Sequence, residues 1–160
     1  MHLAQLNVGK LLAPIDDPMI DDFRENLDRI NALAERSPGY IWRLQDDNGN
    51  ATNINVFGDD REIINLSVWD SVEALAEFTY RSGHVEFLRR RREFFEVPTQ
   101  AIFCLWWIPE GTLPSIEDAL SRLEHLRAHG PTPVAFTFRE RFGPEAVDVE
   151  IGSDLDRCPA

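Results

Sequence analysis

The chain is poor in cysteine and has no long hydrophobic run, and both shortages exclude classes of protein. Only Cys104 and Cys158 occur in 160 residues, which is too few for a disulfide-stapled secreted domain and favours a reducing compartment. No apolar run approaches the roughly 20 residues that cross a bilayer. The N-terminus also lacks the basic segment and the apolar stretch of a secretory signal, so we expect a cytoplasmic protein.

Basic residues are also scarce. Lys and Arg number 16 and Asp and Glu number 28, which gives a formal net charge of −12. A negative field of this size repels nucleic-acid phosphates and anionic lipid, so we expect neither as a partner. The one basic cluster, Arg89 to Arg92, wraps around a predicted helix and is interpreted as a solvated face with structural ion pairs.

The sequence has no Gly-rich phosphate loop and no Ser–His–Asp order, so it does not support nucleotide-dependent chemistry or a serine nucleophile. His125 and His129 have the four-residue spacing of two metal ligands on a helix. A positive group is also favoured near a helix C-terminus, and no metal site is expected. Cys104, between two apolar residues of a predicted strand, is interpreted as a small core side chain.

The chain does contain enough apolar material for one core. Hydrophobic residues make up 43% and charged residues 28% of the sequence, which is typical of a soluble globular domain. The length fits one domain, which we expect to span residues 1–142. The acidic segment 143–160 has few apolar residues and is expected to be poorly ordered.

Hydrophobic spacing predicts alternating strands and helices along the chain. The predicted strands cover 3–8, 40–44, 63–69, 101–108 and 134–138, with a further short strand at 53–57. The predicted helices cover 20–34, 72–80, 84–95 and the segment between Ser115 and Gly130. Asp70, three residues before Glu73, is the predicted N-cap of the second helix.

This order of elements matches the ferredoxin-like βαββαβ unit, extended by a C-terminal helix and strand. The expected fold class is α+β, with helices on one face of an antiparallel sheet and a bare opposite face. Because a bare apolar face must be covered, and dimerisation is a common solution, we expect a homodimer.

Strand parity divides the side chains of the two central strands into an apolar set and a polar set. The polar set consists of Gln5, Asn7, Asn65, Ser67 and Trp69. We expect the apolar set to pack on the helices and the polar set to line the bare face.

Aromatic residues of the neighbouring strands are expected to join the polar set. One of Tyr40 and Trp42, and one of Trp106 and Trp107, should lie on that face, and we select Trp42 and Trp106. A mixed polar and aromatic lining suits a small-molecule pocket, because apolar walls give affinity and a few polar groups give orientation. The alternative is that these residues satisfy one another, or water, inside a dimer interface.

One stripe of the helix 84–95 combines a titratable ring, a guanidinium and apolar groups. His84 lies at helical spacing from Leu88, Arg91 and Phe95. His84 is expected to act as a general acid or base near pH 7, with Arg91 holding an anionic group. The alternative is a histidine at a helix start and surface arginines paired with nearby glutamates.

Four short motifs resemble the dimeric α+β barrel superfamily, which includes the antibiotic-biosynthesis-type monooxygenases and the haem-degrading monooxygenases. They are the strand-to-helix run from Asn65 to Leu75, the turn Ser37-Pro38-Gly39-Tyr40, Asn7 in the first strand, and His84 after the helix. A bacterial family of unknown function within this superfamily is similar over about residues 3–142. That similarity lies in Asn-Leu-Ser-Val-Trp at 65–69, Tyr80-Arg81-Ser82-Gly83-His84, Arg89 to Arg92, Leu105-Trp106-Trp107, Gly130-Pro131 and Ala135-Phe136-Thr137-Phe138.

Residues and resemblance together indicate a small-molecule pocket protein. The resemblance implies a monooxygenase-like enzyme that acts on a small apolar or aromatic compound without a tightly bound cofactor. Asn7 and His84 are the expected catalytic residues. The expected substrate-binding residues are Gln5, Trp42, Asn65, Ser67, Trp69, Arg91 and Trp106. Two alternatives stay open: a non-catalytic ligand-binding or stress-associated dimer, and a haem-binding protein.

Overall fold

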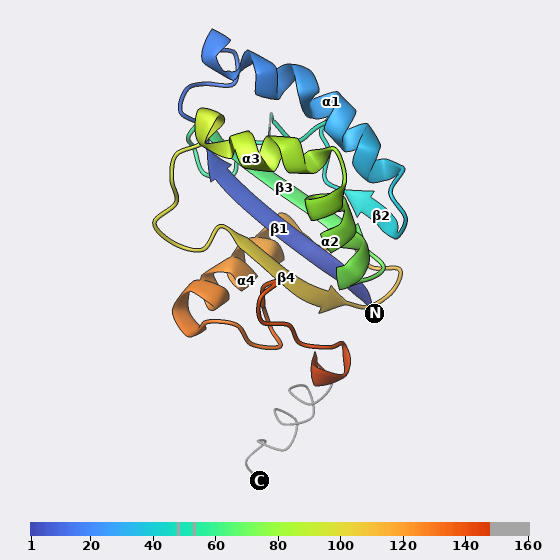
Figure 1. Ribbon diagram of the computed structural model, residues 1–160. Coiled ribbons are helices and arrows are strands. Elements are labelled where there is room, and N and C mark those ends of the chain that lie inside the picture. Colours follow the sequence, from blue (N-terminus) through green and yellow to red (C-terminus); the bar gives the residue numbers. More distant parts are fainter. Residues whose placement is uncertain (48, 53, 148–160) are drawn as a thin grey trace.

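The centre of the molecule is a four-stranded antiparallel sheet (Figure 1). This computed structural model describes residues 1–147 except residues 48 and 53. The strands are β1 (His2–Lys10), β2 (Tyr40–Arg43), β3 (Glu62–Trp69) and β4 (Phe103–Ile108). Their order in the sheet is β2-β3-β1-β4, which confirms the ferredoxin-like α+β fold.

Four α-helices accompany the sheet within the described residues. They are α1 (Asp21–Glu35), α2 (Val72–Arg81), α3 (His84–Phe94) and α4 (Ile116–His129), and a 3-10 turn, η1 (Pro18–Ile20), precedes α1. All four helices were predicted, with their ends shifted by a few residues at most. In this part of the chain no helix has the length and apolar character needed to span a bilayer.

The start of α2 differs from the prediction by one residue. Ser71, not Asp70, is the N-cap, and its Oγ accepts a hydrogen bond from the backbone N–H of Ala74 at 3.2 Å. The Asp70 carboxylate instead accepts a hydrogen bond from Ser71 Oγ at 2.7 Å. Ser and Asp are equally good caps, so the sequence alone did not distinguish them.

Two segments that were predicted as strands do not form strands in the structure. Residues 134–138 make only isolated bridges, in which Phe136 and Leu105 exchange two backbone hydrogen bonds of 2.8 Å. Of the short strand predicted at 53–57, residues 54–57 adopt bends and irregular structure, and residue 53 lies outside the described residues. Of the acidic segment 143–160, only 143–147 lie within the described residues, so the expectation for the remainder lies outside them.

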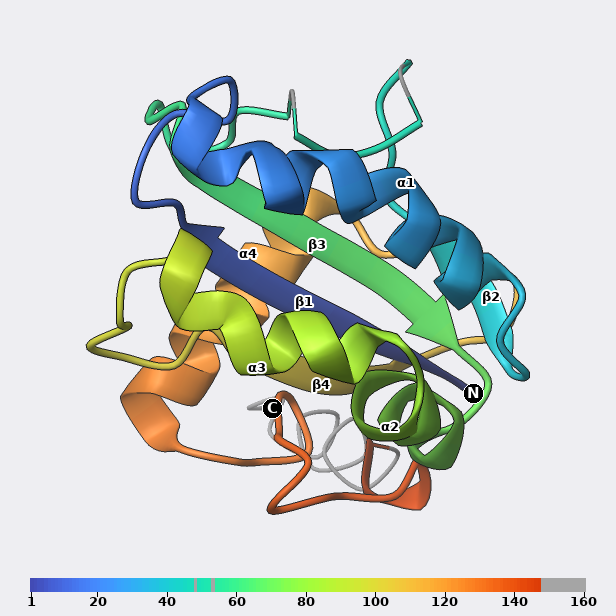
Figure 2. The ribbon, with the colours of Figure 1, turned by 45° about the horizontal axis from the view of Figure 1, so that its top comes forward.

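The two faces of the sheet carry different helices, with α1, α2 and α3 on one side and α4 on the other (Figures 1 and 2). The polar set faces α1 to α3, because Trp69 packs with Val72 and Leu75 of α2. The apolar set faces α4, where Leu6 belongs to the same cluster as Leu123. The prediction of which side of the sheet the polar set and the apolar set each face was therefore wrong. The reason is that α4, predicted only as an extension, supplies the main apolar partner of the sheet.

The face that was expected to be bare is covered by the chain itself. Leu6 and Val68 are fully buried there and Leu66 is 1% exposed. α4 covers one part of the face, and partly buried side chains between residues 42 and 56 cover another. A homodimer stays a prediction, and a dimer formed on this side would contact α4 and that segment rather than the strands.

Candidate functional site

Two hydrophobic clusters lie between the sheet and the helices α1 to α3, one at each end of the sheet. The first includes Leu3, Trp69, Val72, Leu75 and Phe136. The second includes Leu11, Ile20, Phe23, Ile63 and Phe94. The central part of β1 and β3, between these clusters, carries the polar residues Gln5, Asn7, Asn65 and Ser67.

The middle of α1 does not pack into either cluster. Phe23 and Ala34, near the two ends of its apolar face, each belong to a cluster. Leu27 and Ile30 between them are only partly buried and belong to no hydrophobic cluster. The middle of α1 therefore contributes no side chain to the two clusters that flank the polar centre of the sheet.

Asn65 shows that this space reaches solvent. β3 is an interior strand of the sheet and Asn65 points toward the helical side, yet its side chain is exposed. Asn7 lies directly opposite on β1 and is half-buried. Figure 2 shows β3 and β1 behind the helical layer, visible between the ribbons of α1 and α3. We call the space between α1 and α3 above Asn7 and Asn65 the interhelical gap.

The floor of the gap offers two primary amides. Opposite residues of antiparallel strands have Cβ atoms about 5 Å apart, so the Asn7 and Asn65 amides can contact one small ligand together. Among the described residues neither amide has a hydrogen-bond partner. Each amide can donate and accept hydrogen bonds, which suits recognition of a carbonyl or hydroxyl group.

Long side chains also join α1 and α3. Arg90 Nη2 of α3 lies 2.8 Å from Asp22 Oδ2 of α1 and 2.8 Å from Glu93 Oε2. Farther along, the Arg29 guanidinium stands 5.6 Å from the centre of the Phe87 ring. These contacts join the two helices in addition to the packing of Phe23 against Phe94 at one end, where the ring centroids are 5.8 Å apart.

A relay of buried hydrogen bonds, from Trp69 through Ser67 to Gln5, lies at one end of the gap. Trp69 Nε1 donates to Ser67 Oγ at 3.0 Å, and Ser67 Oγ donates to Gln5 Oε1 at 2.8 Å. Gln5 and Ser67 are 5% and 6% exposed and Trp69 is fully buried. Part of the predicted polar set thus satisfies itself within one chain, whereas the alternative interpretation placed such pairing inside a dimer interface.

His84 lies beside that relay at the first residue of α3. Its Nδ1 is 3.3 Å from the Thr79 carbonyl oxygen, and because a carbonyl only accepts, Nδ1 carries the proton. Nε2 makes no hydrogen bond within the described residues and keeps its lone pair. Burial lowers the pKa of His84 below 6.5, and the hydrogen bond to Thr79 offsets part of this effect. At neutral pH the ring is a neutral base.

Stacked aromatic rings connect His84 to the relay. The Phe78 ring lies 5.0 Å from the His84 ring and stacks on Trp69 at 5.2 Å with an interplanar angle of 25°. Tyr40 meets Trp69 edge-on at 5.6 Å. The structure therefore brings His84 to the Trp69 end of the gap.

Two predicted pocket residues lie on the opposite face of the sheet. Trp42 pairs with Val68 and packs in the α4 cluster, because a register shift between Tyr40 and Trp42 turns it to that side. Trp106 is fully buried there, with its Nε1 unpartnered and the Arg122 guanidinium 5.4 Å from its ring. Selecting Trp42 and Trp106 for the polar face was wrong.

Tyr40 and Trp107, the alternatives considered in the sequence, lie on the helical side. Tyr40 and Trp107 both pack against the Trp69 cluster. Trp107 Nε1 donates to the Phe142 carbonyl at 2.7 Å, so it serves the C-terminal segment and not the gap. Sequence reasoning had no signal for the irregularity in β2.

Arg91 is not part of the gap. It is exposed and lines a surface hollow with Leu88, Arg89 and Arg92. Sequence reasoning also missed Arg43, which pairs with Ser67 across the strands. Arg43 is 10% exposed, and its Nη2 lies 2.9 Å from Glu35 Oε1, so it ties β2 to the end of α1.

The described residues hold no group of three or more metal-ligating side chains. The rings of His125 and His129 are 4.6 Å apart, and His125 Nε2 lies 2.9 Å from Thr132 Oγ1. His84 Nε2 is the atom that would hold a haem iron, because the other ring nitrogen of His84 is held by the Thr79 carbonyl, as in many ligating histidines.

Comparisons with known proteins give a family and solved structures of low similarity. SnoaB, described as a cofactor-independent oxygenase from Streptomyces nogalater, has a TM-score of 0.46 and 16% identity over 71% of this chain and 98% of its own. A structural genomics protein, YJCS, has a TM-score of 0.44 and 12% identity over 68% of this chain and 100% of its own. No curated protein matches the chain. A family model described as a domain of unknown function, DUF3291, matches residues 2–151, so the chain belongs to that family.

Proposed function

We propose that the protein binds a small, largely apolar or aromatic molecule in the interhelical gap and acts on it as a monooxygenase-like enzyme without a tightly bound cofactor. The exposure of Asn65 beneath the helical layer carries this proposal. A polar side chain on an interior strand is normally buried and paired, so an open one with apolar walls around it favours a ligand site.

The proposed site contains three kinds of group, and each has a different role. Leu27 and Ile30 supply apolar walls, and the amides of Asn7 and Asn65 orient an oxygen of the ligand. His84 Nε2 removes a proton from the substrate, and the amides stabilise the oxyanion that forms. The deprotonated substrate is the electron-rich species that reacts with dioxygen.

The electron balance limits the substrate class. Dioxygen takes up four electrons when one atom enters the product and the other leaves as water. Without an external reductant, all four come from the substrate, as when an acidic methylene becomes a carbonyl. The proposed substrate is therefore an aromatic compound that carries such a methylene.

Dioxygen uptake with a panel of these compounds tests the proposal. We expect uptake equal to the product formed, with one labelled oxygen atom per product molecule. His84→Ala and Asn7→Ala should each lower the rate at least about tenfold, while Leu113→Ala, at an exposed apolar position, should not. Unchanged rates in both site variants would show that the site assignment is wrong.

Saturable binding without turnover would favour the non-catalytic binder instead. Hemin titration tests the remaining alternative. An absorbance band that His84→Ala abolishes would support a haem protein, and a flat titration would eliminate it.

A further inference from the structure

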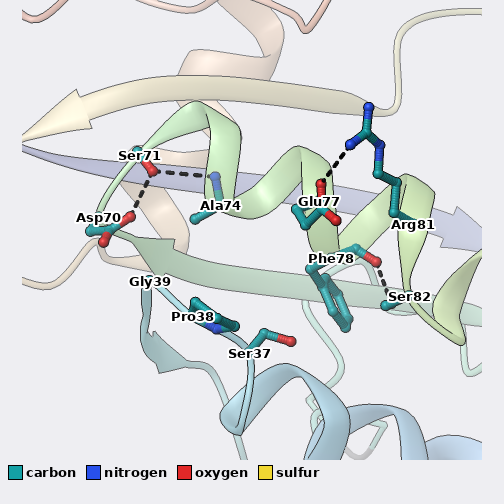
Figure 3. Close-up of a pocket in the computed structure, with 10 residues that line it drawn as sticks. All are labelled: Ser37, Pro38, Gly39, Asp70, Ser71, Ala74, Glu77, Phe78, Arg81 and Ser82. Carbon is teal, nitrogen blue, oxygen red and sulfur yellow. Dashed lines mark hydrogen bonds and ion pairs between the residues drawn. The ribbon is translucent and has the colours of Figure 1, made fainter.

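A surface hollow of about 440 Å³ lies between the turn that joins α1 to β2 and the exposed side of α2. Figure 3 shows Pro38 and Gly39 on one side of it and Ala74, Glu77 and Phe78 on the other. The turn follows directly after the C-terminus of α1, the helix whose middle roofs the interhelical gap. The hollow and the gap therefore lie one after the other along α1.

Phe78 stands between these two spaces. It lines the hollow, and its ring stacks on Trp69 and contacts His84, which close the near end of the gap. The Leu33 side chain of α1 also comes close to the start of α3, since a Cβ placed on Gly83 would lie 3.4 Å from Leu33 Cδ2. Phe78 is thus the lining residue of the hollow that also contacts Trp69 and His84 at the near end of the gap.

The lining of the hollow suits an apolar chain with a polar end. Pro38, Ala74 and Phe78 supply its apolar surface. Charged groups stand at the rim, where Arg81 Nη1 lies 3.4 Å from Glu77 Oε2 and both side chains are mostly exposed. Because these charges are exposed, their mutual attraction is weak. A ligand whose polar end lies at the rim leaves them in contact with water.

We propose that this hollow is a second ligand subsite, which takes the distal apolar part of an elongated ligand, and that Phe78 sets the length of ligand that the protein accepts. The inference rests on the proposed function, because the reactive end of the ligand is placed in the gap. It adds a substrate class, namely aromatic compounds with an apolar extension.

A series of para-alkylphenols, from ethyl to octyl, tests the subsite. Dissociation constants are measured by calorimetry for the wild type, Phe78→Ala and Phe78→Trp. Each buried methylene contributes about 0.8 kcal/mol, so a chain that gains two or three buried methylenes binds more than tenfold tighter. We expect Phe78→Ala to tighten octylphenol binding by at least that factor and to change ethylphenol binding less than twofold. Phe78→Trp should weaken octylphenol selectively.

Phe57→Ala is the matched control, because it removes the same side chain from an exposed loop position. Phe78→Leu keeps most of the packing against Trp69 and replaces the alanine variant if that variant melts early. An octyl-to-ethyl ratio that is the same in wild type and Phe78 variants would overturn the subsite.

The experiment separates this inference from the proposed function. If Asn65→Ala leaves all alkylphenols bound while Phe78→Ala shifts the length preference, the subsite stands and the assignment of the gap fails. If Asn65→Ala abolishes binding and Phe78→Ala changes no ratio, the gap stands and the subsite is wrong. If the wild type binds no member of the series, both are contradicted.

Discussion

Ser67 and Asn65 lie two residues apart on the same face of β3 and have different roles. Ser67 is buried and is the only acceptor described for the Trp69 indole. Asn65 is exposed and has no side-chain partner within the described residues. Ser67→Ala should lower the free energy of unfolding by about 1–3 kcal/mol, because the indole N–H is left buried without an acceptor.

Asn65→Ala should change the free energy of unfolding by less than about 0.5 kcal/mol and act on ligand binding instead. Urea unfolding of both variants measures the contrast. Equal costs for the two substitutions would mean that Asn65 is a structural residue and that the gap is packed.

The titration of His84 makes the free energy of unfolding depend on pH, and the direction of the change follows from its pKa. Burial lowers the pKa of His84 in the folded state below the ordinary value of 6.5. As the pH falls through 6.5, the unfolded state takes up a proton that the folded state resists, so the free energy of unfolding decreases. At higher pH the ring is neutral in both states and this loss is absent.

His84→Gln isolates that contribution, because glutamine does not titrate. Urea unfolding at pH 7.5 and pH 5.5 should show a larger loss of stability in the wild type than in His84→Gln. The other titrating groups are common to both proteins and cancel in the comparison. A larger loss in the variant would contradict a neutral, buried ring.

At the scale of the elements, periodicity predicted the helices and the strands of the sheet, because each carries an apolar stripe or alternation of its own. It also separated Asn65 and Ser67 from the apolar side chains of β3. Periodicity did not show which side of the sheet each set faces. The side depends on packing against α4, which lies far from β1 and β3 in the sequence. The register shift at Tyr40 and Trp42 leaves no periodic signal either.

The turn between α1 and β2 depends on one glycine. Gly39 has φ of +82°, and a Cβ there would clash with Asp70 Oδ1 and lie 2.5 Å from the Ala74 Cβ. Gly39→Ala should therefore combine backbone strain with a clash against α2 and lower stability by about 2 kcal/mol or more.

Gly111→Ala is the matched control, because Gly111 has φ of +78° and a Cβ there would meet no atom within 4 Å. Urea unfolding of both variants separates the clash from the strain that they share. Equal losses would show that the turn does not close against α2.

For the whole molecule, the two sides of the sheet are packed unequally. Leu123 of α4 is 1% exposed and packs in the hydrophobic cluster between α4 and the sheet. α1 carries Leu27 above the polar floor, outside every cluster. Leu123→Ala should cost about 2–5 kcal/mol, and Leu27→Ala less than about 1 kcal/mol.

Both substitutions remove the same atoms from a helix, so chemical denaturation compares the two sides directly. A cost for Leu27→Ala as large as that for Leu123→Ala would place α1 in a filled core. The net charge of −12 acts equally on both variants and does not affect the comparison.

The most direct test of the interhelical gap is a two-dimensional NMR titration of the protein with para-ethylphenol. The side-chain amide signals of Asn7 and Asn65 are identified by their loss in the alanine variants. We expect both signals to shift saturably, while the signal of the Trp106 indole N–H, which is buried on the opposite face, does not shift. Amide signals that stay in place, or a shift confined to Trp106, would contradict a ligand site between α1 and α3.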